Sequence, residues 1–433
     1  MISFSILTLG CKVNSYESEA VINKLITEGF VLKEFNDVCD VYIVNSCTVT
    51  KTSDQKSRQM LHAAKRRNPN AIIAVMGCYS QLNITEASTI ADIVIGTNNK
   101  LNVVDLIKSC LDTKKQIIAV TDVLNNPTYE EMKVSALKTH TRGFIKIQDG
   151  CENYCSYCAI PYSRGKIRSR IPDHVIDEIN GLVSSGAKEV ILAGINTGTY
   201  GQDLGNINLA KLIERIMEET KIYRLRLSSI ELMEITDELL NTLKKYEHRI
   251  ANHLHIPIQG GSEAVLRRMN RKYTITEYEQ KINAVRKLFP DVALTTDILA
   301  GFVGETEEEF NETICFINKI KFYEMHVFPY SRRANTKADE MDGHLDKKVI
   351  TARAKQISEV ANQLKIDYIN NYIGKSLDVL VEAKKGSLWH GHTSNYLDVY
   401  FESNNELENK IVKVKLIKYQ NGKILGEMEE MYE

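Results

Sequence analysis

Short apolar runs alternate with helical stretches through the middle of the chain. RGFIKIQ at 142–148 is followed by a segment at 173–186 that places apolar residues at helical spacing and ends on a glycine. The alternation continues with strands at 188–194, 223–231, 250–259, 292–301 and 324–331 and with helices at 209–219 and 236–246. Six strands alternating with helices predict a parallel sheet that closes into a partial (β/α)6 barrel. In barrels of this class the chemistry lies at the carboxyl ends of the strands.

A second α/β pattern precedes this barrel. Three apolar runs, at 5–11, 41–47 and 72–78, each end in a cysteine, and helical segments at 15–29 and 53–67 lie between them. Continuous apolar strands are typical of an open parallel sheet, which binds ligands at the carboxyl ends of its strands. The pattern predicts that three strand-end cysteines converge in space: Cys11, Cys47 and Cys78.

The chain changes character after about residue 371. LDVLVEAKK, YLDVYFES and KIVKVKLIKY alternate apolar and polar residues with period two, and turns rich in Gly, Ser and Asn separate them. This pattern predicts a small antiparallel β-barrel, preceded by a linking helix at 346–369. The predicted domains are an open α/β domain at 1–125, the partial barrel at 137–368 and the small barrel at 371–433.

Composition narrows the setting. The chain has 433 residues, and its 55 Lys and Arg nearly balance 56 Asp and Glu, so any nucleic-acid surface must be a local patch. The N-terminus lacks a basic region before its apolar run, and no apolar stretch approaches the ~20 residues that cross a bilayer. A cytoplasmic protein with no membrane contact is expected, whose nine cysteines are reduced thiols or metal ligands.

A tight loop carries three more cysteines. Cys151, Cys155 and Cys158 follow the spacing C-x3-C-x2-C, so one loop supplies three soft ligands. With a fourth ligand such as His174 they would form a zinc site. In a cubane iron-sulfur cluster the same three cysteines leave one iron open to a substrate.

For the strand-end cysteines the alternative is simple burial in the core, and that explanation is adopted for the remaining three: Cys39, Cys110 and Cys315.

These motifs resemble the radical S-adenosylmethionine (SAM) methylthiotransferases. The C-x3-C-x-aromatic-C loop, with Tyr157 as its aromatic residue, is similar to the radical-SAM signature, and the strand-end cysteines are similar to the N-terminal domain of that family. The resemblance covers essentially the whole chain, including GCENYCSYCAIPYSRGKIRSR, HLHIPIQ and GFVGETEEEF. Val303 and Gly260 depart from a proline and a serine that are common in the family, beside the implied SAM pocket.

The family has three branches that differ in substrate. TLGCKVNSYESE at 8–19, with RSR at 168–170 and HLHIPIQ at 253–259, resembles the branch that acts on N6-threonylcarbamoyladenosine in tRNA. The isopentenyladenosine branch has Gln and Met where this chain has Lys12 and Val13, and the branch that modifies ribosomal protein S12 has Pro-Lys-Asn there. The resemblance implies a tRNA methylthiotransferase that adds a methylthio group to C2 of N6-threonylcarbamoyladenosine at position 37, next to the anticodon.

The resemblance also implies the cofactors, two [4Fe–4S] clusters and SAM. The cluster of the 151–158 loop would bind SAM and cleave it to a 5′-deoxyadenosyl radical, which removes hydrogen from C2 of the adenine. The cluster of the strand-end cysteines would carry the sulfur that is transferred. An electron donor of the flavodoxin or ferredoxin type is implied as a partner. The residues implied in SAM binding are Tyr157, Gly194, Asn196, Ser228, Glu231 and Gln259; for Ser228 and Glu231, the alternative is a polar strand end bonded to local backbone.

Basic residues near the implied active site are candidates for tRNA phosphates. SRGKIRSR at 163–170 and SRR at 331–333 supply the predicted contacts, Arg164, Arg168, Arg170 and Arg332. The alternative is a solvated charged face.

The small barrel resembles the RNA-binding TRAM domain of the family. Residues 371–433 hold 8 Lys and Arg against 10 Asp and Glu, so RNA would need a patch such as Lys413, Lys415 and Lys418, with Tyr396 or Trp389 for stacking. A scaffold or dimer contact is the competing function of this barrel, and the expected state is a monomer or homodimer. For the whole chain, the alternative from another class is a non-catalytic metal-binding protein that binds RNA.

Overall fold

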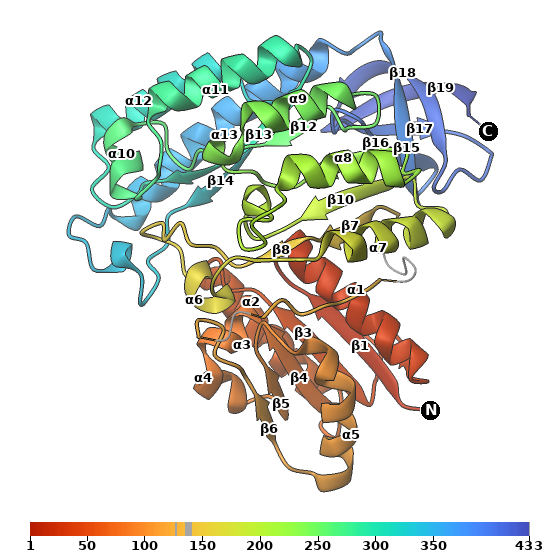
Figure 1. Ribbon diagram of the computed structural model, residues 1–433. Helices are drawn as coiled ribbons and strands as arrows, with labels where there is room; N and C mark the ends of the chain where they lie inside the picture. Colours follow the sequence, from red (N-terminus) through yellow and green to blue (C-terminus); the bar gives the residue numbers. More distant parts are fainter. Residues whose placement is uncertain (126–127, 135–140, 433) are drawn as a thin grey trace.

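A computed structural model describes residues 1–125, 128–134 and 141–432 (Figure 1). The N-terminal sheet is wholly parallel, with the order β2-β1-β3-β4-β5-β6. The chain passes from β1 to β2 on one side and then to β3 on the other, so the strand order reverses between β1 and β3. Its strands are β1 (Ser3–Thr8), β2 (Val31–Leu32), β3 (Val41–Ser46), β4 (Ile72–Gly77), β5 (Ile93–Ile95) and β6 (Ile117–Ala119). A crevice for ligands forms at such a reversal.

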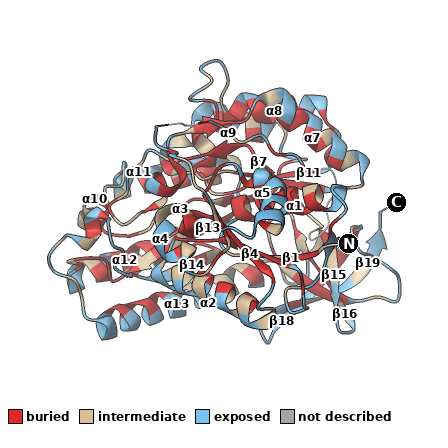
Figure 2. Ribbon diagram, turned by 90° about the horizontal axis from the view of Figure 1, so that it is seen from below, coloured by how far each residue is buried: buried red, intermediate tan, exposed pale blue. Residues whose placement is uncertain are grey.

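Helices cover both faces of this sheet. Phe4, Val21 and Ile107 belong to a buried cluster on one face, and Tyr42, Leu61 and Ala64 belong to a cluster on the other. The helices are α1 (Lys12–Thr27), α2 (Lys51–Arg67), α3 (Cys78–Leu82), α4 (Ile84–Ser88) and α5 (Val103–Thr113), with a 3₁₀ turn, η1 (Lys100–Asn102). Figure 2 shows β4 of this sheet in the colour of buried residues.

The central domain confirms the predicted partial barrel. Parallel pairs join β7, β10 and β11 in one half and β12, β13 and β14 in the other. Parallel bridges from Leu225 to Ile250 and from Ser229 to His255 join the halves, giving the order β7-β10-β11-β12-β13-β14. The strands are β7 (Gly143–Lys146), β10 (Glu189–Ala193), β11 (Arg224–Leu227), β12 (His253–His255), β13 (Ala293–Ala300) and β14 (Glu324–Pro329).

Helices follow the barrel strands on the outside, as the alternation predicts. They are α7 (Pro172–Ser184), η2 (Thr197–Thr199), α8 (Leu209–Glu219), η3 (Leu232–Glu234), α9 (Asp237–Lys245), α10 (Glu263–Arg268), α11 (Ile275–Leu288), α12 (Glu307–Ile320) and η4 (Lys337–Asp339). Near the start of the barrel, β8 (Gln148–Asp149) and β9 (Arg168–Ser169) pair around a short helix, α6 (Ile160–Arg164). The predicted start of this domain at 137 lies outside the described residues.

The C-terminal segment is a closed five-stranded barrel, as predicted, reached through helix α13 (Lys347–Asn370). Its order is β15-β16-β17-β19-β18, antiparallel except for β17 and β19. The strands are β15 (Ser376–Lys385), β16 (Leu388–Thr393), β17 (Asp398–Glu402), β18 (Ile411–Gln420) and β19 (Lys423–Met431).

Two residues of this barrel that were predicted to stack on RNA bases pack against other parts of the protein instead. Trp389 lies in the barrel core. The ring of Tyr396 stacks on His253, with centroids 4.8 Å apart, and the guanidinium of Arg226 lies 4.7 Å from its centroid. The stacking prediction is therefore wrong for both, because they fill the core and the contact with the central barrel.

Candidate active site

The three strand-end cysteines meet at the crevice of the N-terminal sheet. Cys11 caps helix α1, Cys47 follows β3 and Cys78 begins α3 after β4. Gly10 has a positive φ of 106°, and a Cβ there would lie 3.0 Å from Sγ of Cys47, so a side chain would crowd the thiols. Nδ2 of Asn14 donates to the carbonyls of Leu9 and Ser46, at 2.7 and 3.1 Å, and holds the two loops together.

The second cysteine set lies on the loop between β8 and α6, at the mouth of the central barrel. Ser156 anchors this loop, because its backbone N–H donates to the carbonyl of Met269 and its hydroxyl donates to that of Arg268. Tyr157 packs edge-on against Phe302. Arg271 donates to Sγ of Cys155 at 3.4 Å and forms an ion pair with Glu231. These contacts hold the loop against the barrel.

Both sets fit iron-sulfur clusters by donor chemistry. Each offers three soft thiol ligands, and a guanidinium touches one sulfur in each, since Nε of Arg164 donates to Sγ of Cys78 at 3.2 Å. Burial raises the pKa of Cys47 to about 11 and that of both Cys151 and Cys158 to about 12, so these thiols lose protons when metal binds. His174, the fourth ligand of the zinc alternative, instead faces Glu131 at 3.4 Å.

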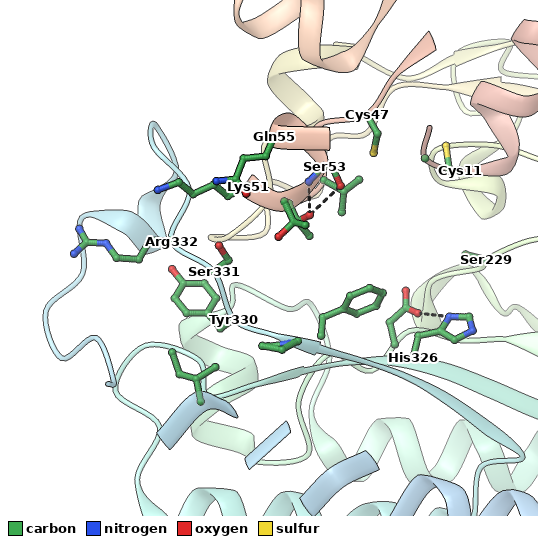
Figure 3. A pocket seen from close by; sticks show the side chains of 18 of the residues that line it. Cys11, Cys47, Lys51, Ser53, Gln55, Ser229, His326, Tyr330, Ser331 and Arg332 are labelled. Carbon is green, nitrogen blue, oxygen red and sulfur yellow. Dashed lines mark hydrogen bonds and ion pairs between the residues drawn. The ribbon is translucent and has the colours of Figure 1, made fainter. Parts of the chain in front are cut away.

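A cavity of about 1030 Å³ lies between the N-terminal sheet and the mouth of the barrel. Cys11 and Cys47 line it from the sheet, and Gly194, Ser228 and Arg332 line it from the barrel. Figure 3 shows Cys11, Cys47 and Arg332 around it. The volume is at the upper end of the roughly 300–1,000 Å³ that small-molecule sites occupy. Two of the three strand-end cysteines, Cys11 and Cys47, therefore share one cavity with the loops that follow the barrel strands.

The other residues predicted to bind SAM surround this mouth without lining the cavity. Asn196 is buried, and its backbone N–H donates to Oε1 of Gln148 at 2.9 Å. Glu231 joins the cysteine loop through Arg271, and Gln259, with a positive φ of 68°, bonds to Asp297. Direct contact of these residues with SAM stays a prediction. Ser228 fits both alternatives. Its hydroxyl forms a hydrogen bond with that of Thr197 at 2.8 Å, and the residue also lines the cavity.

Three of the four arginines predicted to contact tRNA phosphates are inaccessible. Arg164, Arg168 and Arg170 are at most 2% exposed, because α6 and β9 pack under the N-terminal domain. Their partners are carboxylates: Arg164 binds Glu17 at 2.6 Å, Arg168 binds Asp149 at 3.3 Å, and Arg170 binds Glu178. The phosphate prediction is wrong for these three. Arg332 is exposed at the cavity, pairs with Asp339 at 2.8 Å, and stays a candidate.

Sequence analysis did not single out a polar cluster on the cavity wall. Oδ1 of Asp297 lies 3.2 Å from Nδ1 of His326 and 3.4 Å from Nε2 of His255. The two imidazole rings stack with centroids 5.7 Å apart. His255 ends β12, but Asp297 and His326 lie within β13 and β14, so a rule that looks only at the carboxyl ends of strands finds the first of the three and not the other two.

Comparison with known protein families places both halves of this site. A model of the Radical SAM superfamily matches residues 145–317, and a model described as Uncharacterized protein family UPF0004 matches residues 3–96. The threonylcarbamoyladenosine tRNA methylthiotransferase MtaB of Bacillus subtilis is 40% identical, covering 98% of this chain and 96% of that protein. Its Thermotoga maritima namesake is 38% identical over 94% and 93%. A tRNA-2-methylthio-N(6)-dimethylallyladenosine synthase of a Thermoanaerobacter species is 33% identical over 99% and 93%.

Among solved structures, similarity extends to the fold alone. The radical SAM methyltransferase TsrM of Kitasatospora setae has a TM-score of 0.54 at 14% identity, covering 78% of this chain and 75% of that one. The cobalamin-dependent SAM radical enzyme OxsB has a TM-score of 0.51 at 12% identity, over 82% and 56%.

Proposed function

The chain belongs to the radical-SAM methylthiotransferase family, and from this we propose that it converts N6-threonylcarbamoyladenosine at position 37 of tRNA into its 2-methylthio derivative. The observation that carries the proposal is the shared cavity, where Cys11 and Cys47 of one domain face Gly194 and Ser228 of the other. The 40% identity to a threonylcarbamoyladenosine enzyme, against 33% to a dimethylallyladenosine enzyme, supports the choice of branch.

The chain's own residues prepare this cavity for the reaction. When bound, SAM and two [4Fe–4S] clusters supply the radical and the sulfur. Cys11, Cys47 and Cys78 would hold one cluster and Cys151, Cys155 and Cys158 the other. Arg271 and Glu231 fix the second set, while Asn14 and Arg164 fix the first, so both are positioned in advance. Arg332 at the open side would bind a tRNA phosphate.

Further partners follow from the same chemistry. Reductive cleavage of SAM needs one electron, and we propose a flavodoxin or ferredoxin as its donor, with the enzyme acting as a monomer or homodimer. No helix among the described residues is both long and apolar enough to span a membrane.

Nucleoside analysis of tRNA tests the substrate. In a strain that lacks this gene and has no second enzyme for the reaction, N6-threonylcarbamoyladenosine is expected to accumulate and its 2-methylthio form to disappear. The intact gene should restore the product, and a Cys155→Ala gene should not, because the loop loses a ligand. Persistence of the product, or loss of 2-methylthio-isopentenyladenosine instead, would refute the proposal.

The C-terminal barrel is proposed to add tRNA affinity through its exposed lysines on β18. Replacing Lys415 and Lys418 by Gln is expected to weaken tRNA binding and to reduce the slope of log affinity against log salt by about 2, since each phosphate contact contributes about 1. Filter binding at several salt concentrations measures both. Lys281→Gln with Lys287→Gln, on helix α11, is the matched control. An unchanged slope would indicate a scaffold instead.

A further inference from the structure

The charge of the cavity wall is strongly biased. Four cations line it, and among the described residues of the lining Asp297 is the one acid. The cations are Lys12, Lys51, Arg332 and Lys347. Such a wall concentrates anions, and it holds more positive charge than binding a neutral adenine ring requires.

Lys12 is the cation nearest the cysteines in sequence. It begins helix α1 immediately after Cys11 and lines the cavity that His326 lines from the barrel. Within the described part of the chain its ammonium forms no ion pair, whereas Arg332 is paired with Asp339. Lys12 is therefore available to an anion in the cavity.

His326 offers a second donor in the same cavity. Its Nδ1 lies 3.2 Å from Oδ1 of Asp297, so the Nε2 side of the ring remains for a ligand, and the side chain is 55% exposed. The hydrogen bond with Asp297 raises the pKa of His326, which favours the form that donates from both nitrogens. Asp297 is itself ionised, because donors from His255 and His326 outweigh its burial and lower its pKa. Figure 3 shows His326 on the barrel wall, opposite the loop of Cys11.

We propose that Lys12 and His326 form a subsite for the carboxylate of the threonylcarbamoyl group. This rests on the proposed function, in which C2 of the adenine must face the strand-end cysteines. The substituted N6 is attached to C6, which belongs to the same six-membered ring as C2. If C2 faces the strand-end cysteines, the substituent therefore lies near residues next to those cysteines. Two charged donors bind a carboxylate strongly. An uncharged isopentenyl group would leave the same cations unpaired, which weakens its binding.

The test uses binding, which does not require turnover. Reconstituted enzyme is titrated with three anticodon stem-loop RNAs, carrying at position 37 N6-threonylcarbamoyladenosine, its carboxylate methyl ester, or adenosine. The wild type is expected to bind the acid about 10- to 100-fold more tightly than the ester, the range of one or two charge-assisted hydrogen bonds. Lys12→Gln and His326→Gln should each bring the ratio of acid affinity to ester affinity down toward 1, whatever change they cause in the binding of the adenosine RNA.

The controls separate this subsite from general attraction to RNA. Lys51→Gln, at another lysine of the cavity, should weaken all three RNAs by a similar factor. His326→Gln lies far in sequence from the cysteines, so it tests the subsite even if Lys12→Gln loses iron. Equal weakening of acid and ester by both variants would overturn the proposal. So would a divalent metal bound by the wild type and lost in His326→Gln, because His255, Asp297 and His326 also match a metal's ligands, with donor atoms within 4.8 Å.

Product analysis distinguishes an error in the carboxylate subsite from an error in the proposed reaction. If the wild type forms the 2-methylthio product but does not distinguish acid from ester, the subsite is wrong and the function stands. If it modifies isopentenyladenosine instead, the function itself is wrong.

Discussion

Replacing Cys151, Cys155 and Cys158 together by alanine is expected to lower the iron content from about eight to about four atoms per chain and to abolish SAM cleavage. The two cysteine sets lie on different elements, one at the strand ends of the N-terminal sheet and the other on the loop between β8 and α6. The first set therefore keeps all three of its own ligands and should keep its cluster. Iron, acid-labile sulfide and zinc are assayed after anaerobic reconstitution, and 5′-deoxyadenosine release reports SAM cleavage.

Two further triple variants make this result specific. Replacing Cys11, Cys47 and Cys78 should also leave about four irons, but with SAM cleavage retained and no methylthio product. Replacing the remaining cysteines, Cys39, Cys110 and Cys315, should leave about eight, because they are predicted to bind no metal. Cys39 and Cys110 are buried as predicted, whereas Cys315 is exposed on helix α12, so the burial prediction is wrong for it. Loss of all iron from the first variant, or zinc in place of iron in the wild type, would refute the two-cluster assignment.

The fold could be predicted where hydrophobic periodicity is strong. All six barrel strands and the first three sheet strands that end in cysteine were located from apolar runs. The strands β5 and β6 were not, because they are only three residues long and β6 is partly exposed at the sheet edge. Strands β16 and β19 were also missed, since LWHGHT and KILGEMEEM show little apolar alternation.

Residues of the site could be predicted where their position at the end of a strand places them. They could not be predicted where their contacts come from residues distant in the sequence. Parallel strands bring their carboxyl ends to one edge, so cysteines at 11, 47 and 78 could be grouped from sequence. A run of arginines carries no such information. Arg164 meets Glu17, 147 positions away, and only tertiary packing decides whether a cation faces solvent or a buried carboxylate.

Arg164, which is buried and does not face phosphates, connects the two cysteine sets. Arg164 contacts Cys78, Asn14 and Glu17 of the N-terminal domain and Asp149, two residues before Cys151. Lys146 of the barrel also binds Glu17, at 3.0 Å. Buried charges thus set the relative position of the two sites.

Arg164→Met is accordingly expected to destabilise the enzyme by about 3–5 kcal/mol and to cost iron at the first cysteine set, because Glu17 and Asp149 lose a buried partner. Although burial opposes ionisation, Arg164, Lys100 and Lys146 lower the pKa of Glu17 to about 2. That stabilisation is present above the unfolded pKa of about 4.3 and is lost as the pH falls toward 2. Without Arg164 the pKa of Glu17 rises, so acid unfolding should begin at a higher pH. Urea unfolding at pH 7 and at pH 4, with iron assays, measures both effects.

Matched variants distinguish whether the loss of stability and iron comes from the charge network or from the change in side-chain volume. Arg332→Met removes an exposed arginine and should change the free energy of unfolding by less than about 0.5 kcal/mol, with iron unchanged. Arg164→Lys keeps the charge but cannot reach Cys78, Asn14 and Glu17 together, so it should fall between the wild type and Arg164→Met. If Arg164→Met unfolded like the wild type at both pH values and kept about eight irons, the buried arginine would not be what holds the two cysteine sets in register.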